Sequence, residues 1–239
     1  MNYNILCIIP ARSGSKGIPH KNIKLLKDKP MIYYSIDQAL TCKYKMRIIV
    51  TTDSDEYRQL ILKKYNNSVE IPFLRPKEIS GDLSTDKEFI IHCLDYLRKE
   101  KYKSDFIVQL RPTYPLRKIE ILNDTIEKFI NNRNKYDSLR TVIPIEKSPY
   151  KMYRINNNIL KPLFKEVDYN GKIIKEPYNE CRQTLPDIYL HNGYIDILNT
   201  NIVENNTISG DNIFPYIMSK NDYHDIDNIE DFNIIENLI

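Results

Sequence analysis

The sequence of 239 residues contains no tryptophan and only four cysteines, which lie far apart. Cys7, Cys42, Cys93 and Cys181 form no CxxC pair, and the four histidines show no metal-ligand spacing, so neither a zinc site nor a disulfide framework is predicted. Cys7 falls in an expected strand and Cys93 in an expected helix. We interpret both as small core residues.

The sequence also lacks long apolar runs and a surplus of one charge. No stretch approaches the roughly 20 apolar residues that a membrane helix requires, and the short apolar run near the N-terminus lacks the charged lead of a signal peptide. The 35 basic and 32 acidic residues leave a net charge of +3, so a nucleic-acid-binding surface is not implied. We therefore expect a cytoplasmic protein whose partners include neither membrane nor nucleic acid.

Glycine is scarce, with six residues in all, but two of them lie in the loop after the first expected strand. That strand, Ile5–Ile9, is apolar throughout, which is typical of a strand buried on both faces. The loop is not a P-loop, because the Lys-Ser/Thr pair is missing. It is not a dinucleotide fingerprint either, because only Gly14 and Gly17 are present.

The residues that this loop does contain suit a polyphosphate. Its glycines and serines allow a sharp turn that points main-chain N–H groups at one spot. Arg12, Lys16 and Lys21 bring three positive charges to the same place. The alternative interpretation is an ordinary turn with solvated lysines.

Strand-like and helical segments alternate along most of the chain. Expected strands at 5–9, 47–51, 70–74, 106–110, 138–144, 188–198 and 213–218 alternate with expected helices at about 30–42, 55–65, 85–97, 119–130 and 228–239. This alternation predicts an α/β fold with a mostly parallel central sheet flanked by helices on both faces. We expect a single domain over residues 1–239.

The alternation breaks between about residues 146 and 183. Short β-like pieces lie at 150–155 and 159–165, and Asn170-Gly171 is a hairpin signal. We interpret this segment as an insertion of antiparallel strands. Its apolar side chains are typical of a subunit interface, and packing onto its own domain is the alternative.

Charged residues gather where the expected strands end, which is where ligands bind in α/β sheets. The ends of the first four strands are followed by the loop 12–22, Thr52-Asp53, Arg75-Pro76 and the segment 111–117. A segment with several carboxylates, 222–227, lies near the last strand. Basic groups and carboxylates in one crevice suit a nucleoside triphosphate with Mg²⁺.

Asp225 and Asp227 are the metal-ligand candidates in this segment. In an extended chain, side chains two residues apart face the same way, so both carboxylates can reach one cation. The alternative is that Asp227 caps the last helix.

Together these residues resemble the acylneuraminate cytidylyltransferase family, the CMP-sugar synthetases that include CMP-sialic acid synthetase. The resemblance covers nearly the whole chain. It rests on segments that occur in the family's order: IPARSGSKG at 9–17 with Lys21-Asn22, TTD at 51–53, Arg75-Pro76 followed by Asp82, RPTYPLR at 111–117, RQTLP at 182–186, Asn192-Gly193 and Asp225-Ile226-Asp227.

This resemblance implies a Rossmann-like nucleotidyltransferase fold with a small antiparallel β appendage for dimerisation. It implies a homodimer that uses Mg²⁺, activates a nonulosonic acid (a sialic-acid-like sugar) with CTP, and releases the CMP-sugar and pyrophosphate. The alternatives are a cytidylyltransferase for another anionic acceptor, either Kdo-like or bearing a phosphate or phosphonate, and a non-catalytic nucleotide-binding protein of the same fold.

The resemblance also implies roles for individual residues. The nucleotide-binding set is Ala11, Arg12, Ser13, Gly14, Ser15, Lys16, Lys21, Asn22, Arg75 and Asp82. The acceptor-binding set is Arg111, Thr113, Tyr114, Arg182, Gln183 and Asn192. The Mg²⁺ ligands are Asp225 and Asp227, and the catalytic set is Arg12, Lys16, Lys21 and Asp227.

One segment departs from the family pattern. CMP-sialic acid synthetases usually carry Gln-Pro-Thr-Ser-Pro where this chain has Arg-Pro-Thr-Tyr-Pro at 111–115. Glutamine offers neutral hydrogen bonds, whereas Arg111 offers a bidentate fork for a carboxylate or phosphate. We hypothesise an acceptor other than N-acetylneuraminate, and the alternative is that Arg111 pairs internally with a carboxylate.

Overall fold

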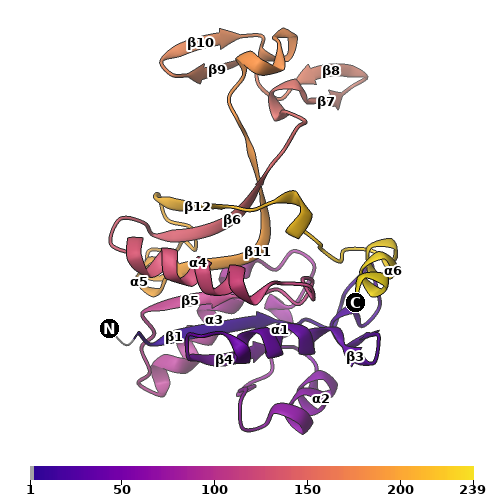
Figure 1. Cartoon of the computed structure of the whole chain (residues 1–239), viewed down its shortest axis with the longest axis vertical. Helices are drawn as coiled ribbons and strands as arrows, with labels where there is room; N and C mark the ends of the chain where they lie inside the picture. Colours follow the sequence, from indigo (N-terminus) through magenta and orange to yellow (C-terminus); the bar gives the residue numbers. More distant parts are fainter. Residues whose placement is uncertain (1–2) are drawn as a thin grey trace.

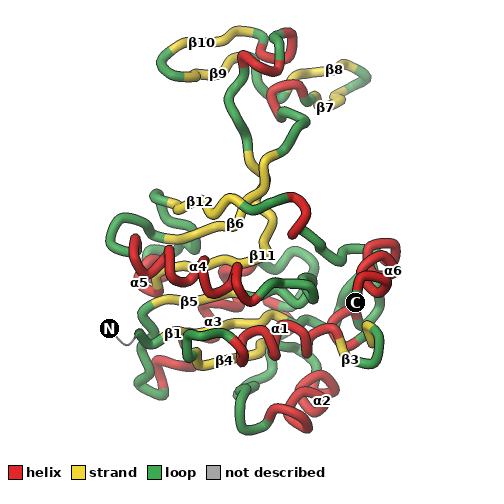
Figure 2. The backbone as a smooth tube through the Cα atoms, viewed as in Figure 1, coloured by secondary structure: helices red, strands yellow, loops and turns green. Residues whose placement is uncertain are grey.

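A central sheet of six strands organises the computed structural model, which describes residues 3–239 (Figures 1 and 2). In spatial order the strands are β12 (Ile213–Ile217), β6 (Ser138–Pro144), β11 (Tyr189–Asn199), β5 (Phe106–Gln109), β1 (Ile5–Pro10) and β4 (Met46–Thr51). Strand β11 runs antiparallel to both of its neighbours, and the other pairs in the sheet are parallel. The prediction of a mostly parallel sheet is confirmed.

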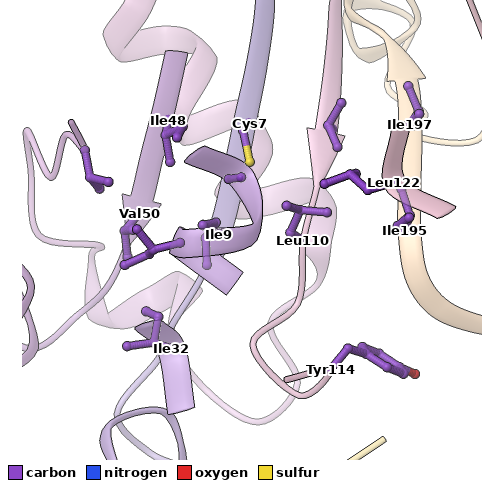
Figure 3. Close-up of a cluster of buried hydrophobic side chains, with 14 of the residues drawn as sticks. Cys7, Ile9, Ile32, Ile48, Val50, Leu110, Tyr114, Leu122, Ile195 and Ile197 are labelled. Carbon is purple, nitrogen blue, oxygen red and sulfur yellow. The ribbon is translucent and has the colours of Figure 1, made fainter. Parts of the chain in front are cut away.

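Helices cover both faces of the sheet, as predicted. The larger core takes buried side chains from α1 (Met31–Thr41), α2 (Asp55–Tyr65) and α4 (Ile119–Asn132), and Figure 3 shows part of it. The opposite face is covered by α3 (Asp86–Lys99) and α5 (Thr200–Glu204). Cys7 lies in the first core and Cys93 in the second, so both are the core residues that the sequence predicts.

Side chains cap the starts of three helices. The Ser54 side chain caps α2, and Thr85 forms a capping box with Glu88 at the start of α3. The last helix, α6 (Ile229–Leu238), is capped by Asn228, whose side chain accepts from two main-chain N–H groups. Asp227 is therefore not the cap, and its carboxylate remains available for another role.

The prediction of a strand at 70–74 is wrong. Only Glu70 pairs with the sheet, through a single bridge to Ile49. Pro72 has no N–H to donate to the ladder, and the chain turns away until the N–H of Arg75 donates to the Thr52 carbonyl oxygen at 2.7 Å. This departure brings Arg75 to the carboxyl end of β4.

The loop after β1 contains short elements that the sequence did not predict. A 3₁₀ turn at Lys21–Ile23 is followed by the two-residue strands β2 (Leu25–Leu26) and β3 (Lys29–Pro30), which pair with each other. They lead directly into α1, which begins at Met31 rather than at Pro30.

Residues between β6 and β11 form two hairpins that stand apart from the sheet on two extended arms (Figure 1). One hairpin pairs β7 (Tyr153–Asn156) with β8 (Ile159–Pro162), and the other pairs β9 (Glu166–Tyr169) with β10 (Lys172–Lys175). The predicted turn at Asn170-Gly171 has positive φ at both residues. We call these hairpins the appendage. It leaves apolar side chains in solvent, among them Ile155 at 75% exposure.

No helix within residues 3–239 combines the length and the hydropathy that crossing a bilayer requires.

Candidate active site

A pocket of about 410 Å³ opens at the carboxyl ends of β1 and β5. It is lined by residues from the loop after β1 (10–22), by Arg75, by residues near the start of α3 (82–89) and by residues 111–113 after β5. Ligand pockets usually measure about 300–1,000 Å³, so this one suits a small molecule such as a nucleotide.

Three larger hollows lie elsewhere. One of about 760 Å³ is lined by residues of α2, and the other two lie at the opposite end of the sheet, near the amino ends of the strands. The first of these two, of about 1210 Å³, is lined by Asn4 and Lys45 among others, and the second, of about 830 Å³, by Ser104 and Asp137 among others. None of the candidate phosphate-binding residues lines any of the three hollows. Because ligands of α/β sheets bind at the carboxyl ends of the strands, we assign the chemistry to the smaller pocket.

Two of the predicted phosphate-binding cations meet on one carboxylate. Arg12 Nη1 lies 2.8 Å from Asp82 Oδ1, and Lys16 Nζ lies 2.6 Å from Asp82 Oδ2. The hydrogen bonds from Lys16 and Arg12 hold the pKa of Asp82 below its usual value. Asp82 thus bridges the cations in the way that a phosphate group would.

The third cation, Lys21, joins the loop after β1 to the late aspartates. Its Nζ donates to the Ile226 carbonyl oxygen at 2.8 Å and lies 3.8 Å from Asp227 Oδ1. Gly17 packs so closely on this segment that a Cβ there would lie 2.5 Å from the Asp227 carbonyl oxygen. Segments separated by about 200 residues of sequence therefore lie in direct contact.

Asp225 and Asp227 differ in environment. The Asp227 side chain is 76% exposed, whereas Asp225 is partly buried. Burial shifts the pKa of Asp225 upward and the charge of Asp227 adds to this shift, while the hydrogen bond from Tyr114 opposes it only in part. One Asp225 oxygen, Oδ1, is buried without a hydrogen-bond partner.

A buried carboxylate oxygen without a partner is costly unless a cation or donor reaches it, so this arrangement fits a divalent metal. Within the described residues, no group of three or more His, Cys, Asp or Glu side chains is placed to hold a metal. A cation held by Asp225 and Asp227 would thus need further oxygen ligands from outside the chain, such as phosphate oxygens.

Internal hydrogen bonds hold three other predicted nucleotide-binding residues. Arg75 is 5% exposed and donates to the Thr51 carbonyl oxygen at 2.7 Å. The Asn22 side chain donates to the Arg12 carbonyl oxygen at 2.9 Å. Ser13 donates to Asp53 through both its main-chain N–H, at 2.7 Å, and its hydroxyl, at 2.8 Å. These bonds fix the shape of the loop.

Arg111 pairs internally, which is the alternative that the sequence left open. Its Nη2 lies 2.5 Å from Asp86 Oδ2, and its Nη1 lies 2.5 Å from Asp196 Oδ2 and 2.9 Å from the Gly193 carbonyl oxygen. Its charge is balanced by two carboxylates, although it lines the pocket. Sequence reasoning missed Asp86, because a carboxylate in the first turn of a helix is explained by the helix dipole alone.

Two predicted acceptor-binding residues are buried. Tyr114 is 1% exposed, and Asn192 is 6% exposed, with its amide oxygen accepting from Thr141 Oγ1 at 2.7 Å. Neither side chain lines the pocket in this structure, so their contact with an acceptor stays a prediction. Thr113 does line the pocket.

Arg182 and Gln183 belong to a 3₁₀ turn at the base of the appendage. Arg182 lines a separate cavity of about 210 Å³ with Glu146 and Tyr189, at the point where the arms leave the sheet. Neither residue lines the pocket of its own chain at the ends of β1 and β5.

Comparisons with known proteins identify the family of this chain. The family model described as Cytidylyltransferase matches residues 6–179. Pseudaminic acid cytidylyltransferase of Campylobacter jejuni is 33% identical over 70% of this chain and 70% of its own length. CMP-N,N'-diacetyllegionaminic acid synthase of Legionella pneumophila is 32% identical over 98% of this chain and 96% of its own length.

Among solved structures, a CMP:2-keto-3-deoxy-manno-octonic acid synthetase complexed with CTP superposes with a TM-score of 0.69. The alignment covers 98% of both chains at 14% sequence identity, so this likeness concerns the fold. The family match, which spans most of the chain, and the relatives at about one-third identity show that this chain belongs to the cytidylyltransferase family.

Proposed function

We propose that this protein transfers CMP from CTP to a nonulosonic acid and releases pyrophosphate. The observation that carries the proposal is the contact between the basic loop after β1 and the segment of Asp225 and Asp227. The names of the two relatives, which refer to pseudaminic and legionaminic acids, support an acceptor of this class. Because the reaction consumes CTP, we also propose that it takes place in the cytoplasm.

The chain's own residues would act chiefly by positioning and charge neutralisation. The triphosphate would take the place of Asp82 between Arg12 and Lys16, with Lys21 beside it. The anomeric hydroxyl of the sugar then attacks the α-phosphorus in line. A new oxygen–phosphorus bond forms, the bond to the β-phosphate oxygen breaks, and pyrophosphate leaves. Asp227, which is exposed, would accept the hydroxyl proton.

We propose Mg²⁺ as the cofactor, held by Asp225 and Asp227 together with phosphate oxygens. The ion would neutralise phosphate charge and lower the pKa of the attacking hydroxyl. The unpartnered Oδ1 of Asp225 supports this assignment.

Pyrophosphate release, measured with each nucleoside triphosphate and a panel of acceptors, tests the proposed function. We expect release with CTP and Mg²⁺ when pseudaminic, legionaminic or N-acetylneuraminic acid is supplied, and none with Kdo. Turnover of Kdo alone, or of a phosphate-bearing acceptor, would contradict the proposed acceptor class. The hypothesis of an acceptor other than N-acetylneuraminate depended on an Arg111 free to bind the acceptor. Because Arg111 pairs internally, we expect N-acetylneuraminic acid to be accepted and no phosphate to be required.

We also propose that the protein is a homodimer in which the appendage reaches the partner's pocket. Two-stranded hairpins are marginal on their own, and these leave Ile155, Leu160 and Ile173 more than half exposed. A second copy that covers these side chains would bring Arg182 and Gln183 to an acceptor in the partner's site, which they do not reach in their own chain.

Complementation between two inactive variants tests this arrangement. A purified heterodimer of Asp227→Ala and Arg182→Ala subunits would contain one site with both lesions and one intact site. We expect it to show about half of the wild-type activity, since the two sites of a symmetric dimer are equivalent. A heterodimer no more active than either mutant homodimer would mean that Arg182 does not act across the subunits.

A further inference from the structure

The hydroxyl group of Tyr114 has no part in the function proposed so far, yet it contacts a candidate metal ligand. The ring is 1% exposed and packs edge-on against Tyr194, with 5.2 Å between ring centroids. Figure 3 shows it at the edge of the core with its oxygen pointing away from the aliphatic side chains. Its single proton has two acceptors within reach, Asp225 Oδ2 at 2.9 Å and the Asn192 carbonyl oxygen, and an ionised carboxylate is the stronger acceptor of the two.

The two carboxylate oxygens of Asp225 differ in their hydrogen bonding. Oδ2 is held by Tyr114, whereas Oδ1 is buried and has no partner. The main chain beside Asp225 is tied to the same loop, because the N–H of Ile226 donates to the Thr113 carbonyl oxygen at 3.0 Å. Side chain and backbone of Asp225 are therefore both fixed by residues 113–114.

Hydrogen bonds from a buried arginine hold the loop that makes these contacts. Arg117 is 3% exposed, and its Nη2 donates to the Arg111 carbonyl oxygen at 2.7 Å. Its Nε donates to the Tyr194 carbonyl oxygen at 2.9 Å, and its Nη1 donates to Gln38 Oε1 at 2.5 Å. A loop closed by a buried guanidinium with this many bonds offers a rigid support, which is what a residue that orients a metal ligand needs.

We propose that Tyr114 is a positioning residue that orients Asp225 for divalent-metal binding. The hydroxyl holds Oδ2 and thereby presents Oδ1 to the cation, so the carboxylate does not have to be ordered when the metal arrives. This inference rests on the proposed function, in which Asp225 is a metal ligand. Groups that hydrogen-bond to a metal ligand commonly contribute about 10- to 100-fold in metal affinity.

The variant Tyr114→Phe tests the proposal, because it removes the hydroxyl and keeps the buried ring. The probe is Mn²⁺, whose binding to the CTP-loaded protein is followed by electron paramagnetic resonance without acceptor. We expect the Mn²⁺ dissociation constant to rise about tenfold. CTP affinity measured without metal is expected to stay unchanged, since Tyr114 does not line the pocket.

Tyr194→Phe is the matched control. Tyr194 is also 1% exposed, and its hydroxyl accepts from the Lys118 main-chain N–H at 2.6 Å without contacting Asp225. We expect this variant to lose thermal stability similarly but to bind Mn²⁺ like the wild type. If Tyr114→Phe binds Mn²⁺ like the wild type, or if both variants weaken binding equally, Tyr114 does not position Asp225.

The variant Asp225→Asn shows whether a negative result concerns only the role of Tyr114 or the proposed metal site as a whole. If Asp225→Asn loses Mn²⁺ binding while Tyr114→Phe does not, only the role of Tyr114 is wrong. If Asp225→Asn binds Mn²⁺ normally, Asp225 is not a ligand, and both the metal assignment and the inference fail.

Discussion

Replacing Asp227 by alanine is expected to lower kcat for pyrophosphate release by about 100-fold or more, because a metal ligand and proton acceptor supplies several kcal/mol of transition-state stabilisation. The fold is expected to persist. The side chain is 76% exposed, and Asn228 rather than Asp227 caps α6. The measurement is pyrophosphate release at saturating CTP, acceptor and Mg²⁺, with circular dichroism and thermal melting as tests of folding.

Glu230→Ala is the control for this variant. Glu230 is an exposed carboxylate in the first turn of α6, so its removal changes the net charge by the same amount close to the site. We expect nearly full activity, because no described contact of its side chain involves the pocket. An Asp227→Ala protein as active as Glu230→Ala would show that Asp227 is neither ligand nor base.

Replacing Asp196 by asparagine is expected to lower the free energy of unfolding by about 3–5 kcal/mol at neutral pH, the usual cost of breaking a buried ion pair. Asp196 is fully buried and lies within 2.5 Å of Arg111, 2.9 Å of Arg140 and 2.7 Å of His191. The neutral amide leaves Arg111 and Arg140 without the carboxylate that they share. Urea unfolding followed by circular dichroism measures the loss.

The loss of stability in Asp196→Asn is expected to become smaller at acid pH. Burial raises the pKa of Asp196, but the His191 hydrogen bond and the charges of Arg111 and Arg140 outweigh burial, so the net shift is downward from 3.8. A lowered pKa means that the carboxylate stabilises the folded protein fully above about pH 4, and that this contribution fades as the pH falls further. The difference between wild type and Asp196→Asn should therefore shrink below about pH 4.

An exposed ion pair provides the comparison. Asp95 pairs with Arg98 at 2.6 Å, and both side chains are about half exposed. Asp95→Asn is expected to change the free energy of unfolding by less than about 0.5 kcal/mol, as is usual for exposed pairs. If Asp196→Asn has an equally small effect, or an effect that stays constant from neutral pH to about pH 3, the buried cluster does not stabilise the fold through its charge.

Much of the fold was predictable because its signals are local. The apolar run at Ile5–Ile9, the caps at Ser54 and Thr85 and the hairpin signal at Asn170-Gly171 each depend on residues a few positions apart. The candidate phosphate-binding residues Arg12, Lys16 and Lys21 also come from one contiguous segment. The prediction of a strand at 70–74 was wrong because Pro72, which has no N–H to donate, interrupts an otherwise apolar segment.

Contacts between distant segments were not predictable in the same way. The sequence placed Arg111 at a strand end, but whether its charge faces a ligand or a carboxylate depends on Asp86 and Asp196, which are 25 and 85 residues away. The sequence placed Tyr114 among the acceptor-binding candidates, but in the structure its ring is buried against Tyr194 of β11.

The amino-acid sequence by itself determined the alternating elements, the basic loop after β1 and the two candidate metal ligands, since hydrophobic period and residue type are local properties. Only the tertiary structure decided the direction of β11, the partners of Arg111 and the contact between Tyr114 and Asp225. The physical reason is that strand pairing and buried ion pairs depend on which distant segments meet when the core closes.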